Sequence, residues 1–470
     1  MDFGKNFPEG PSEVSPREPA AAPPRTAAQD GWHVSRYIVA ARIPGDAQGR
    51  FAVANLSRGS CGAYPPLELA ALAMLDELPP DHPAVKRLAR RGLIVNCDER
   101  AALETRARMA CAGGRTVNLT ICPTMACNFD CPYCFEGHGG PTMSQEVQND
   151  VEALAGRMMV AAGARVLRVV WFGGEPLLAT QVIESLSGRL IRLAEGREAK
   201  YHAEAVTNGY LLTPTAAELL GRARVSEVQV TLDGMGAAHD ATRHLAGGGS
   251  TFDRIVENLS RPGLLFRVSV RQNVYRGNLG EAEKVRALAE ELAAQTGNSI
   301  SFCPALVLGS ETAERRGRQV GLLDGPAFSE VMLSNVLPGT GPRAIPCGAC
   351  HLFDLAVDPE GRLYKCRQAV GKPGLSFGTA RDWDPRDPLK TASRPDNLTG
   401  FINCGFPTGD DKCAACLWLP VCAGGCPYER LMHGRRQCVP FRDDPEGYVL
   451  ALWRDRQAKH PLCNREATPM

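Results

Sequence analysis

The stretch that decides the fold reads Cys127-Asn128-Phe129-Asp130-Cys131-Pro132-Tyr133-Cys134. It follows an apolar run at residues 117–121 that predicts a β-strand. The three cysteines therefore lie on the loop that leaves the carboxyl end of a strand, where open α/β sheets and barrels keep their functional residues. Three neighbouring thiolates can bind one soft metal centre. A closed zinc site normally has a fourth ligand close by, so the loop favours a centre left one protein ligand short.

This spacing, with the aromatic Tyr133 before the third cysteine, resembles the cluster loop of the radical S-adenosylmethionine (radical SAM) enzymes. In that family three cysteines bind three irons of a [4Fe–4S] cluster, and the amino and carboxylate groups of S-adenosylmethionine chelate the fourth. The resemblance implies that Cys127, Cys131 and Cys134 hold the catalytic cluster. From the loop alone, a zinc knuckle or a set of buried free thiols stays open as the alternative.

Composition excludes several classes of function. A chain of 470 residues predicts two to four domains, and a net charge of +1 predicts no general attraction to nucleic acid or to anionic membranes. No apolar run approaches the ~18 residues of a spanning helix, and the N-terminus has no signal-peptide pattern. Eighteen cysteines in a large chain of this kind indicate metal binding in a reducing cytoplasm rather than disulfides.

The chain divides into four predicted parts. Residues 1–30 are rich in Pro, Ala, Ser and Glu and predict a disordered tail. Residues 31–112 predict a small separate module, and residues 113–340 alternate between strand and helix patterns. Residues 341–470 change in character, because Gly, Pro and Cys become more frequent and the alternation stops.

The module at residues 31–112 is predicted to be winged-helix-like. Strands are expected at 37–40 and 51–54, a helix from Leu67 to Leu78, a second helix ended by Gly92, and a closing strand at 93–95. This arrangement resembles the peptide-recognition element of enzymes that modify ribosomally made peptides, which captures a leader peptide by adding a strand to its sheet edge. Two alternatives stay open: the module only packs on the next domain, or its second helix binds DNA. The DNA alternative rests on four basic residues of the second helix: Lys86, Arg87, Arg90 and Arg91. The near-neutral charge of the whole chain and the iron chemistry of the next part argue against DNA binding.

Residues 113–340 predict six β/α units. Strands are expected at 117–122, 166–172, 203–208, 227–232, 266–272 and 299–307, with helical stretches that include 151–160 and 281–294. Strands separated by helices imply a parallel sheet with right-handed crossovers. The count matches the partial, TIM-like (β/α)6 barrel of the radical SAM family. A Rossmann sheet would also have six strands, but no GxGxxG motif follows the first strand.

Polar residues follow the carboxyl ends of several predicted strands. The second strand ends in Phe172-Gly173-Gly174-Glu175-Pro176, where glycines allow close backbone approach and a carboxylate can accept hydrogen bonds from an ammonium group. In the resembled family this motif holds the methionine amino group of the nucleotide. Thr207-Asn208-Gly209 and Thr231-Leu232-Asp233-Gly234 end the next two strands and, with His239-Asp240 and Arg243, resemble a string typical of the SPASM-bearing branch.

The resemblance assigns further contacts near the nucleotide, although a helix cap is an alternative role for Asp233 and Arg243. The residues assigned to cofactor binding are Tyr133, Gly173, Gly174, Glu175, Pro176, Asn208, Thr231, Asp233 and Arg243. Arg271 and Asn273 close the fifth strand and are expected near the same pocket. Cys303, within the sixth strand, is expected to be buried in packing.

The cysteines of the last 130 residues match the SPASM signature. Ten residues separate Cys350 from Gly361 and four separate Gly361 from Cys366. Further along the chain, Cys413, Cys416, Cys422 and Cys426 have two, five and three residues between them, and Cys438 follows. In the family such cysteines hold auxiliary [4Fe–4S] clusters. Carried over by position, the two ligand sets are Cys347, Cys350, Cys366 and Cys426, and Cys413, Cys416, Cys422 and Cys438.

Three alternatives remain for these cysteines. Cys404 can replace Cys347, which is closer to Cys350 than the usual first pair; the first cluster can keep an open iron; or one or two zinc sites can stand in place of the clusters. The cysteines outside the pattern are expected to be structural: Cys61, Cys97, Cys111, Cys122 and Cys463.

Together these resemblances predict a maturase that cross-links a ribosomally made peptide, by a thioether or a carbon–carbon bond, through a 5′-deoxyadenosyl radical. The expected partners are a precursor peptide bound through its leader and an electron donor such as flavodoxin or ferredoxin, with no nucleic acid and no membrane. A formylglycine-forming sulfatase maturase is disfavoured, because those enzymes have Asp directly after the cysteine that Cys366 matches and this chain has Arg367. A peptide epimerase with Cys303 as hydrogen donor and a zinc-stabilised peptide-binding protein without chemistry complete the alternatives.

Overall fold

The computed structural model describes residues 31–137, 139–307, 320–322 and 342–459. The predicted tail at residues 1–30, Cys463 and the predicted domain boundary at residue 340 lie outside the described residues. Within them, no helix is both long and apolar enough to cross a bilayer.

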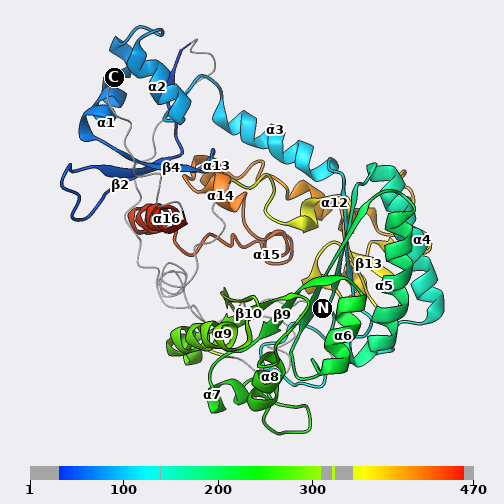
Figure 1. The fold of residues 1–470 in the computed structure, drawn as a ribbon. Helices are drawn as coiled ribbons and strands as arrows, with labels where there is room; N and C mark the ends of the chain where they lie inside the picture. The colour runs from blue at the N-terminus through cyan, green and yellow to red at the C-terminus, as the bar shows by residue number, and fades with distance from the viewer. Residues whose placement is uncertain (1–30, 138, 308–319, 323–341, 460–470) are drawn as a thin grey trace, which may run out of the picture.

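A parallel sheet forms the centre of the chain (Figure 1). All six predicted strands are present, and each pairs in parallel with its sequence neighbour in the order β11-β10-β9-β8-β7-β6. Their bounds are β6 Thr116–Ile121, β7 Val166–Trp171, β8 Lys200–Thr207, β9 Val225–Thr231, β10 Arg267–Val274 and β11 Ile300–Leu306. The predicted mixed α/β architecture with six β/α units is therefore confirmed, and it is consistent with a partial barrel.

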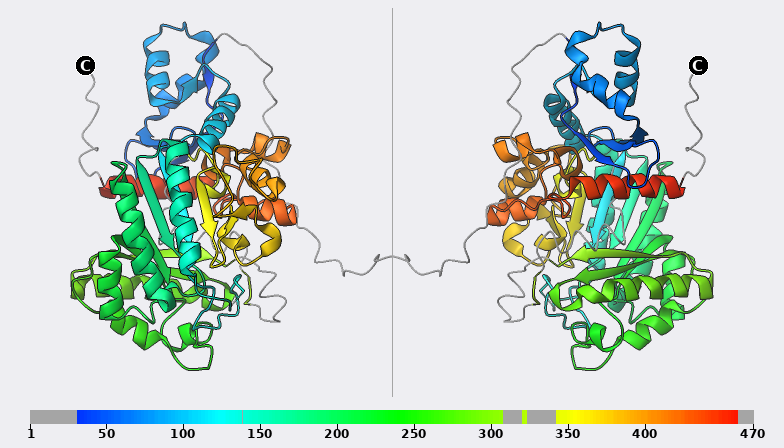
Figure 2. Two further views of the ribbon diagram at one scale, coloured as in Figure 1. Left: turned by 90° about the vertical axis from the view of Figure 1, so that its right-hand side faces the viewer. Right: turned by 90° about the vertical axis from the view of Figure 1, so that its left-hand side faces the viewer.

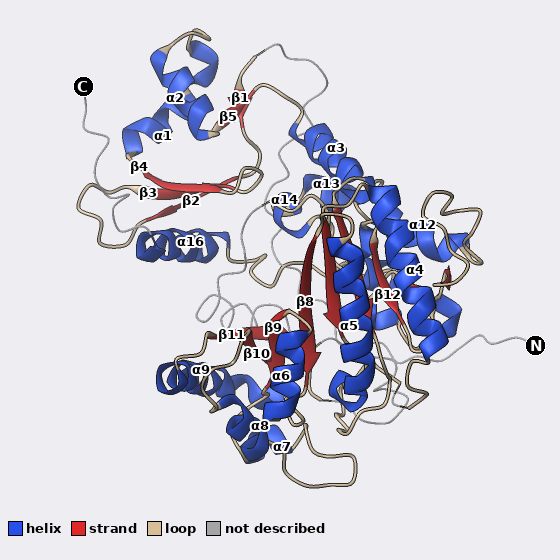
Figure 3. Cartoon of the chain, turned by 45° about the vertical axis from the view of Figure 1, so that its right-hand side comes forward, coloured by secondary structure: helices blue, strands red, loops and turns tan. Residues whose placement is uncertain are grey.

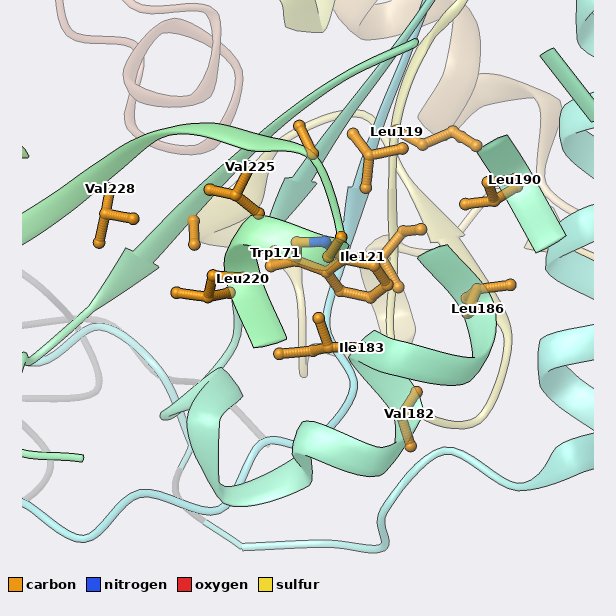
Figure 4. Packing of buried hydrophobic residues seen from close by; sticks show 14 of the residues in the cluster. Leu119, Ile121, Trp171, Val182, Ile183, Leu186, Leu190, Leu220, Val225 and Val228 are labelled. Atoms are coloured by element: carbon orange, nitrogen blue, oxygen red, sulfur yellow. The ribbon is translucent and has the colours of Figure 1, made fainter. Parts of the chain in front are cut away.

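Helices cover one side of this sheet (Figures 2 and 3), and in Figure 2 the C-terminal segments drawn in orange lie on the other. The covering helices are α4 Gln145–Ala162, α5 Thr180–Glu195, α6 Pro214–Arg222, α7 Ala237–Asp240, α8 Phe252–Leu259 and α9 Ala282–Thr296. Between α5 and the sheet, Ile183 and Leu186 pack in one core with Ile121 and Trp171, and all four side chains are fully buried (Figure 4). Each such side chain contributes about 1.5–3 kcal/mol through burial, which fixes the strands whose ends carry the site.

The sheet continues into the cysteine-rich part of the chain, where the sequence pattern predicted no strand. β12, at Asp354–Val357, pairs in parallel with β6, and β13 (Arg362–Tyr364) and β14 (Gly378–Thr379) extend it antiparallel. β12 has only four residues and is buried from Leu355 to Val357, so it has neither the length nor the alternation by which a strand is recognised in a sequence.

The N-terminal module contains two small antiparallel sheets: β1-β5 and β2-β3-β4. Its elements are β1 His33–Val34, β2 Ile38–Arg42, β3 Phe51–Asn55, β4 Ser60–Tyr64, α1 Pro66–Ala73, η1 Leu75–Glu77, α2 Pro83–Arg91, β5 Ile94–Val95 and α3 Glu99–Ala112. The predicted helix from Leu67 to Leu78 is wrong in length, because the chain leaves the α-helix at Met74, and α1 buries none of its residues. Gly92 ends α2 as predicted, with φ of 73°. The winged-helix assignment stays a prediction.

The C-terminal helix α16, Pro445–Lys459, packs against β2, β3 and β4 (Figures 1 and 2). Tyr37 and Val39 share one buried core with Trp418 and Tyr448. Arg456 adds hydrogen bonds to the carbonyl oxygens of Gly59 and Cys61, at 2.6 and 3.1 Å. The first and last described parts of the chain are therefore joined, which no local sequence pattern indicates.

Candidate active site

A cavity of about 250 Å³ lies where the central strands end. Cys127, Cys131 and Cys134 line it together with the glycine turn after β7 and the polar residues after β8, β9 and β10. The structure thus brings the predicted cluster loop and most of the predicted nucleotide contacts to one place. The assigned residues that line the cavity are Cys127, Cys131, Tyr133, Cys134, Gly173, Gly174, Asn208, Thr231 and Arg243.

The cluster loop is held on several sides. Phe129 is fully buried and forms an isolated β-bridge with Leu245, and its backbone N–H donates to Sγ of Cys127 at 3.4 Å. The backbone N–H of Cys134 donates to the carbonyl oxygen of Cys131 at 3.2 Å. Burial raises the pKa of Cys127 to about 12 and also raises that of Cys131. These thiols ionise at neutral pH only if a cationic centre binds them.

The three thiols of the cluster loop line one cavity and form a soft donor set that suits an iron–sulfur cluster. Among the described residues, no three side chains of His, Cys, Asp or Glu converge closely enough to hold one metal ion. A tetrahedral zinc needs all its ligands within about 2.0–2.3 Å of one point, whereas a cubane takes each thiolate on a separate iron. Cys127, Cys131 and Cys134 instead surround one cavity, and Cys127 and Cys131 each raise the pKa of Cys134. The chain therefore offers a soft, buried three-thiol site.

The glycine turn after β7 packs directly under the cluster loop. Gly173 has φ of 115°, and a Cβ atom there would overlap the carbonyl oxygen of Thr124. A Cβ on Gly174 would overlap the carbonyl oxygens of Met125 and Ala126. Both glycines were predicted to allow the close approach of a ligand to the backbone. The structure shows a different reason, because a side chain at either position would push the glycine turn away from residues 124–126.

Glu175 is a fully buried carboxylate at the edge of this turn. Its Oε1 accepts hydrogen bonds from the backbone N–H of Leu177 at 3.0 Å and from Oγ1 of Thr207 at 2.7 Å, and its Oε2 accepts one from the backbone N–H of Asn208 at 2.7 Å. Burial raises the pKa of Glu175, and these three donors oppose the rise. The carboxylate is thus held in one orientation in a low-dielectric site, where it suits a charge-assisted bond to an ammonium group. Pro176 begins the turn that follows, η2 (Pro176–Ala179), and is buried.

Tyr133, Asp233 and Arg243 form a single buried network. The Tyr133 hydroxyl donates to Oδ2 of Asp233, and Arg243 Nη1 donates to the Tyr133 hydroxyl at 2.9 Å. The backbone N–H of Asn273 donates to Oδ1 of Asp233 at 3.0 Å, and the Arg243 guanidinium lies over the Phe129 ring at 5.6 Å. Burial raises the pKa of Asp233, while Arg243 and Tyr133 lower it. These contacts position the cluster loop; direct contact of the three residues with the nucleotide stays a prediction.

Asn208, Arg271 and Asn273 complete the barrel side of the cavity. The Asn208 side chain donates to Oδ1 of Asn128 at 2.7 Å and so joins the end of β8 to the cluster loop. Arg271 Nε donates to Oδ1 of Asn273 at 2.9 Å, and both residues line the cavity as expected.

One wall of the cavity was missed from the sequence. It comes from the segment after β13 and from α15, Pro427–His433, and it includes Gln368, Lys372, Tyr428 and His433. Lys372 Nζ donates to the Tyr428 hydroxyl at 2.6 Å and lies 5.0 Å from the centre of the Tyr428 ring. These residues carry no local motif, and they reach the cavity only because β12 joins the sheet beside β6. Glu136 also lines the cavity and was not predicted to do so. Its position two residues after Cys134 could have indicated this.

The C-terminal cysteines of the two predicted ligand sets interact within each set: in the first, burial raises the pKa of Cys366, and Cys347 and Cys426 raise it further. In the second group, Cys413, Cys416 and Cys438 all raise the pKa of Cys422, whose Sγ accepts the backbone N–H of Gly424 at 3.4 Å. Arg430 Nη2 lies 3.4 Å from Sγ of Cys413, and Arg442 Nη1 lies 3.9 Å from Sγ of Cys438. Such donors favour thiolates, but cluster binding at both groups stays a prediction.

One expectation about the remaining cysteines is wrong. Cys303 is exposed on β11, where it pairs in register with Arg271, and so it is not buried in packing. Cys97 is also exposed, and its structural role stays a prediction. Cys111 and Cys122 are buried and Cys61 is half-buried.

Comparison with known proteins agrees with this geometry. Residues 121–261 match the model of the Radical SAM superfamily. Mycofactocin maturase MftC of Mycobacterium ulcerans is 26% identical over 72% of this chain and 90% of its own length. The serine-type anaerobic sulfatase-maturating enzyme of Klebsiella aerogenes is 24% identical over 64% of this chain and 77% of its own.

Two solved structures share the fold. Native anSMEcpe with bound AdoMet and the Cp18Cys peptide superposes with a TM-score of 0.54 at 18% identity, over 74% of this chain and 99% of that one. SuiB of Streptococcus suis bound to S-adenosylmethionine superposes with a TM-score of 0.51 at 15% identity, over 90% of this chain and 99% of that one. At these identities the likeness shows the architecture alone.

Proposed function

Because this chain carries a radical SAM domain at residues 121–261, we propose that it is a maturase that installs a cross-link in a ribosomally synthesised peptide. Radical SAM enzymes use a [4Fe–4S] cluster and S-adenosylmethionine, which together supply a 5′-deoxyadenosyl radical that abstracts hydrogen from an unactivated carbon. The observation that carries the proposal is one cavity that joins the three-thiol loop to a polar wall from the C-terminal part. Similarity to the mycofactocin maturases over most of the chain supports the peptide substrate.

In this proposal Cys127, Cys131 and Cys134 hold the cluster, and Glu175 accepts hydrogen bonds from the methionine ammonium group. The three hydrogen bonds already on Glu175 hold its carboxylate in one orientation at the edge of the glycine turn. Tyr133, Asp233 and Arg243 fix the cluster loop against the ends of β9 and β10. The chain therefore supplies position and a dry site, and the abstraction itself needs no general base.

The substrate side of the cavity is the wall formed by Gln368, Lys372, Tyr428 and His433. Tyr428 and Lys372 hold each other by a hydrogen bond and a cation–π contact, so the wall is preorganised before a peptide arrives. In the two C-terminal cysteine groups we place the auxiliary clusters, which accept the electron left after cross-linking or bind a substrate thiolate. A flavodoxin or ferredoxin is the electron donor that this chemistry needs.

The N-terminal module is the proposed site for the leader peptide. β2 and β4 are the outer strands of its sheet, and among the described residues neither has a partner strand on its outer edge. An extended leader can add to one of them by backbone hydrogen bonds. The contact of α16 with this sheet holds the module against the C-terminal part of the chain. A module held in place can deliver a bound leader peptide toward the cavity, which a module on a free linker would do less directly.

The alternative of formylglycine formation is disfavoured by Arg367. Its Nε donates to Oγ1 of Thr120 at 3.3 Å, and its guanidinium lies over the Phe172 ring at 5.4 Å, beside the cavity. A cation thus occupies the position where the related sulfatase maturases have an aspartate. Epimerisation is kept as a second candidate, because Cys303 is an exposed thiol beside Arg271, which lines the cavity.

The test is anaerobic co-expression of the chain with short peptides encoded beside it, followed by mass spectrometry. A cross-linking maturase removes two hydrogens for each link. Gain of one deuterium from heavy water without net mass loss in ordinary water indicates epimerisation, and the Cys303→Ala variant should then lose it. A new aldehyde indicates formylglycine formation, and an unchanged, tightly bound peptide indicates a binding protein without chemistry.

A further inference from the structure

The hydrogen bonds of the three-stranded sheet show which residues of β2 face outward. The backbone N–H of Leu56 donates to the carbonyl oxygen of Tyr37 at 2.9 Å, and that of Ile43 donates to the carbonyl oxygen of Arg50 at 3.0 Å. Both pairs continue the register of β2 with β3. Because the bonding direction alternates along an antiparallel strand, every second residue between them turns its N–H and C=O away from β3. These residues are Ile38, Ala40 and Arg42.

The outward backbone of β2 is free for pairing. Among the described residues, Ile38, Ala40 and Arg42 form no backbone hydrogen bond with a loop or another strand beyond this edge. Ala40 and Arg42 are exposed. The Arg42 side chain has no ion pair within the described part of the chain, and the acid of the turn that follows, Asp46, is bound by Arg50 at 2.7 Å. The edge therefore combines a row of unused backbone donors and acceptors with an unpaired cation.

The outer edge of β4 is largely occupied. Since the residues of β3 that face β2 cannot also face β4, the ladder leaves Cys61 and Ala63 turned outward. Arg456 of α16 donates to the carbonyl oxygens of Gly59 and Cys61 at 2.6 and 3.1 Å. At the other end Pro65 has no N–H, and its carbonyl oxygen accepts a hydrogen bond from the first turn of α1 at 3.1 Å. An added strand would find unused groups only at Ala63 and at the N–H of Cys61.

We propose that the leader of the precursor peptide adds as a strand to the outer edge of β2, and that Arg456 blocks the edge of β4. This rests on the leader capture of the proposed function and decides between the two edges that it left open. A strand opposite Ile38–Arg42 gains backbone hydrogen bonds at all three outward residues. The unpaired Arg42 favours a leader with an acidic residue across from it. A second copy of β2 would offer no such partner, because the strand carries no acid.

The test is the binding of a synthetic leader to the anaerobically purified, iron-loaded chain, measured by fluorescence anisotropy. The probe is a fluorescein-labelled copy of the leader of the short peptide encoded beside this chain. Ala40→Pro removes an outward N–H that the ladder with β3 does not use, and its ring obstructs an added strand, so binding should weaken about tenfold or more. Ala63→Pro makes the same change on β4 and is the matched control, with an affinity within about twofold of the wild type.

Two further variants test the edge without a proline. Arg42→Glu reverses the charge at an exposed position and should weaken binding about tenfold. Arg456→Met frees the carbonyl oxygens of β4 and should leave the affinity unchanged. A gain in affinity in Arg456→Met, or a loss in Ala63→Pro without one in Ala40→Pro, would place the leader on β4 and overturn the inference. Unchanged iron content and thermal unfolding show that each variant is folded.

The outcomes separate this inference from the proposed function. A wild-type chain that binds the leader, with unchanged affinity in Ala40→Pro and Arg42→Glu, overturns the assignment of the edge alone. A wild-type chain that does not bind the leader overturns leader capture, and this inference with it, whereas a cross-linked product in the mass spectrum would still support the maturase. A dimer that dissociates in Ala40→Pro, detected by analytical ultracentrifugation of the chain without leader, would assign the edge to a second copy and overturn the inference.

Discussion

The Tyr133 hydroxyl donates a hydrogen bond to the carboxylate of Asp233, joining the cluster loop to the end of β9. Arg243 donates to the same hydroxyl, so one phenol stands between a buried cation and a buried anion. Removing a group that partners two buried charges costs more than removing a neutral hydrogen bond. The position of the cluster loop therefore depends on a residue that is not itself a cluster ligand.

The first prediction follows from this contact. Tyr133→Phe should lower the free energy of unfolding of the iron-loaded protein by about 1–3 kcal/mol, because Asp233 and Arg243 each lose a partner. Thermal unfolding under anaerobic conditions measures the change. Tyr37→Phe is the control: Tyr37 is fully buried, whereas Tyr133 is half-buried, and the Tyr37 hydroxyl has no hydrogen-bond partner among the described residues. Equal effects of the two changes would show that the network does not hold the loop.

The second prediction concerns the glycine turn. Gly174→Ala would place a methyl group against the carbonyl oxygens of Met125 and Ala126, so the cluster loop must move. We expect the variant to lose about 4 irons together with 5′-deoxyadenosine formation. Gly188→Ala within α5 is the control, because the nearest atom to its added Cβ is the end of the Arg192 side chain at 3.6 Å. That change should be neutral or stabilise the protein by up to about 1 kcal/mol. A Gly174→Ala variant with full iron content would contradict the close contact.

The third prediction is a dependence of stability on pH. Burial, and after it the charge of Arg243, lowers the pKa of His239 to about 3 from the ordinary value of 6.5. Nδ1 of the ring accepts a hydrogen bond from the backbone N–H of Asp233 at 3.2 Å. The unfolded chain then binds a proton that the folded chain excludes. The contribution of His239 is complete above pH 6.5 and is lost as the pH falls toward 3, by about 1.4 kcal/mol per pH unit.

Anaerobic melting curves of the iron-loaded protein at pH 7.0 and 5.5 measure this dependence. His239→Gln, which keeps a polar group but cannot titrate, should be less stable at neutral pH and should lose less stability on acidification than the wild type. His202, which is exposed on β8, provides the control variant His202→Gln. Parallel pH profiles for wild type and His239→Gln would rule out the assigned role of the buried ring.

The fourth prediction concerns the missed wall of the cavity. Lys372→Met keeps much of the side-chain volume but removes the charge and the hydrogen bond to Tyr428. We expect the ratio of cross-linked peptide to 5′-deoxyadenosine to fall about tenfold, equivalent to about 1.4 kcal/mol of lost positioning. Lys390→Met, at an exposed position away from the cavity, is the control. An unchanged ratio would remove Lys372 from the substrate side.

Much of the barrel could be predicted because its signals are local. The runs that become β6 and β7 are apolar and are followed at once by cysteines or glycines, so strand, loop and function coincide in one short stretch. The C-terminal cysteines were recognised by spacing for the same reason. A structural feature that depends on contacts between residues close in sequence can be predicted from the sequence alone.

The rest depended on contacts between distant parts of the chain. The four residues of β12 are too short to be recognised alone and become a strand only beside β6. Lys372 and Tyr428 have no motif, yet β12 carries their segments to the cavity. Each of these was missed or left open because packing, not local pattern, decides it.

Formation of 5′-deoxyadenosine by the variant in which Cys127, Cys131 and Cys134 are all changed to Ala is the most direct measurement of the central claim. The account predicts no detectable product and about 4 fewer irons, with the auxiliary iron retained. Product formed at the wild-type rate would contradict the catalytic cluster at this loop, and with it the proposed function.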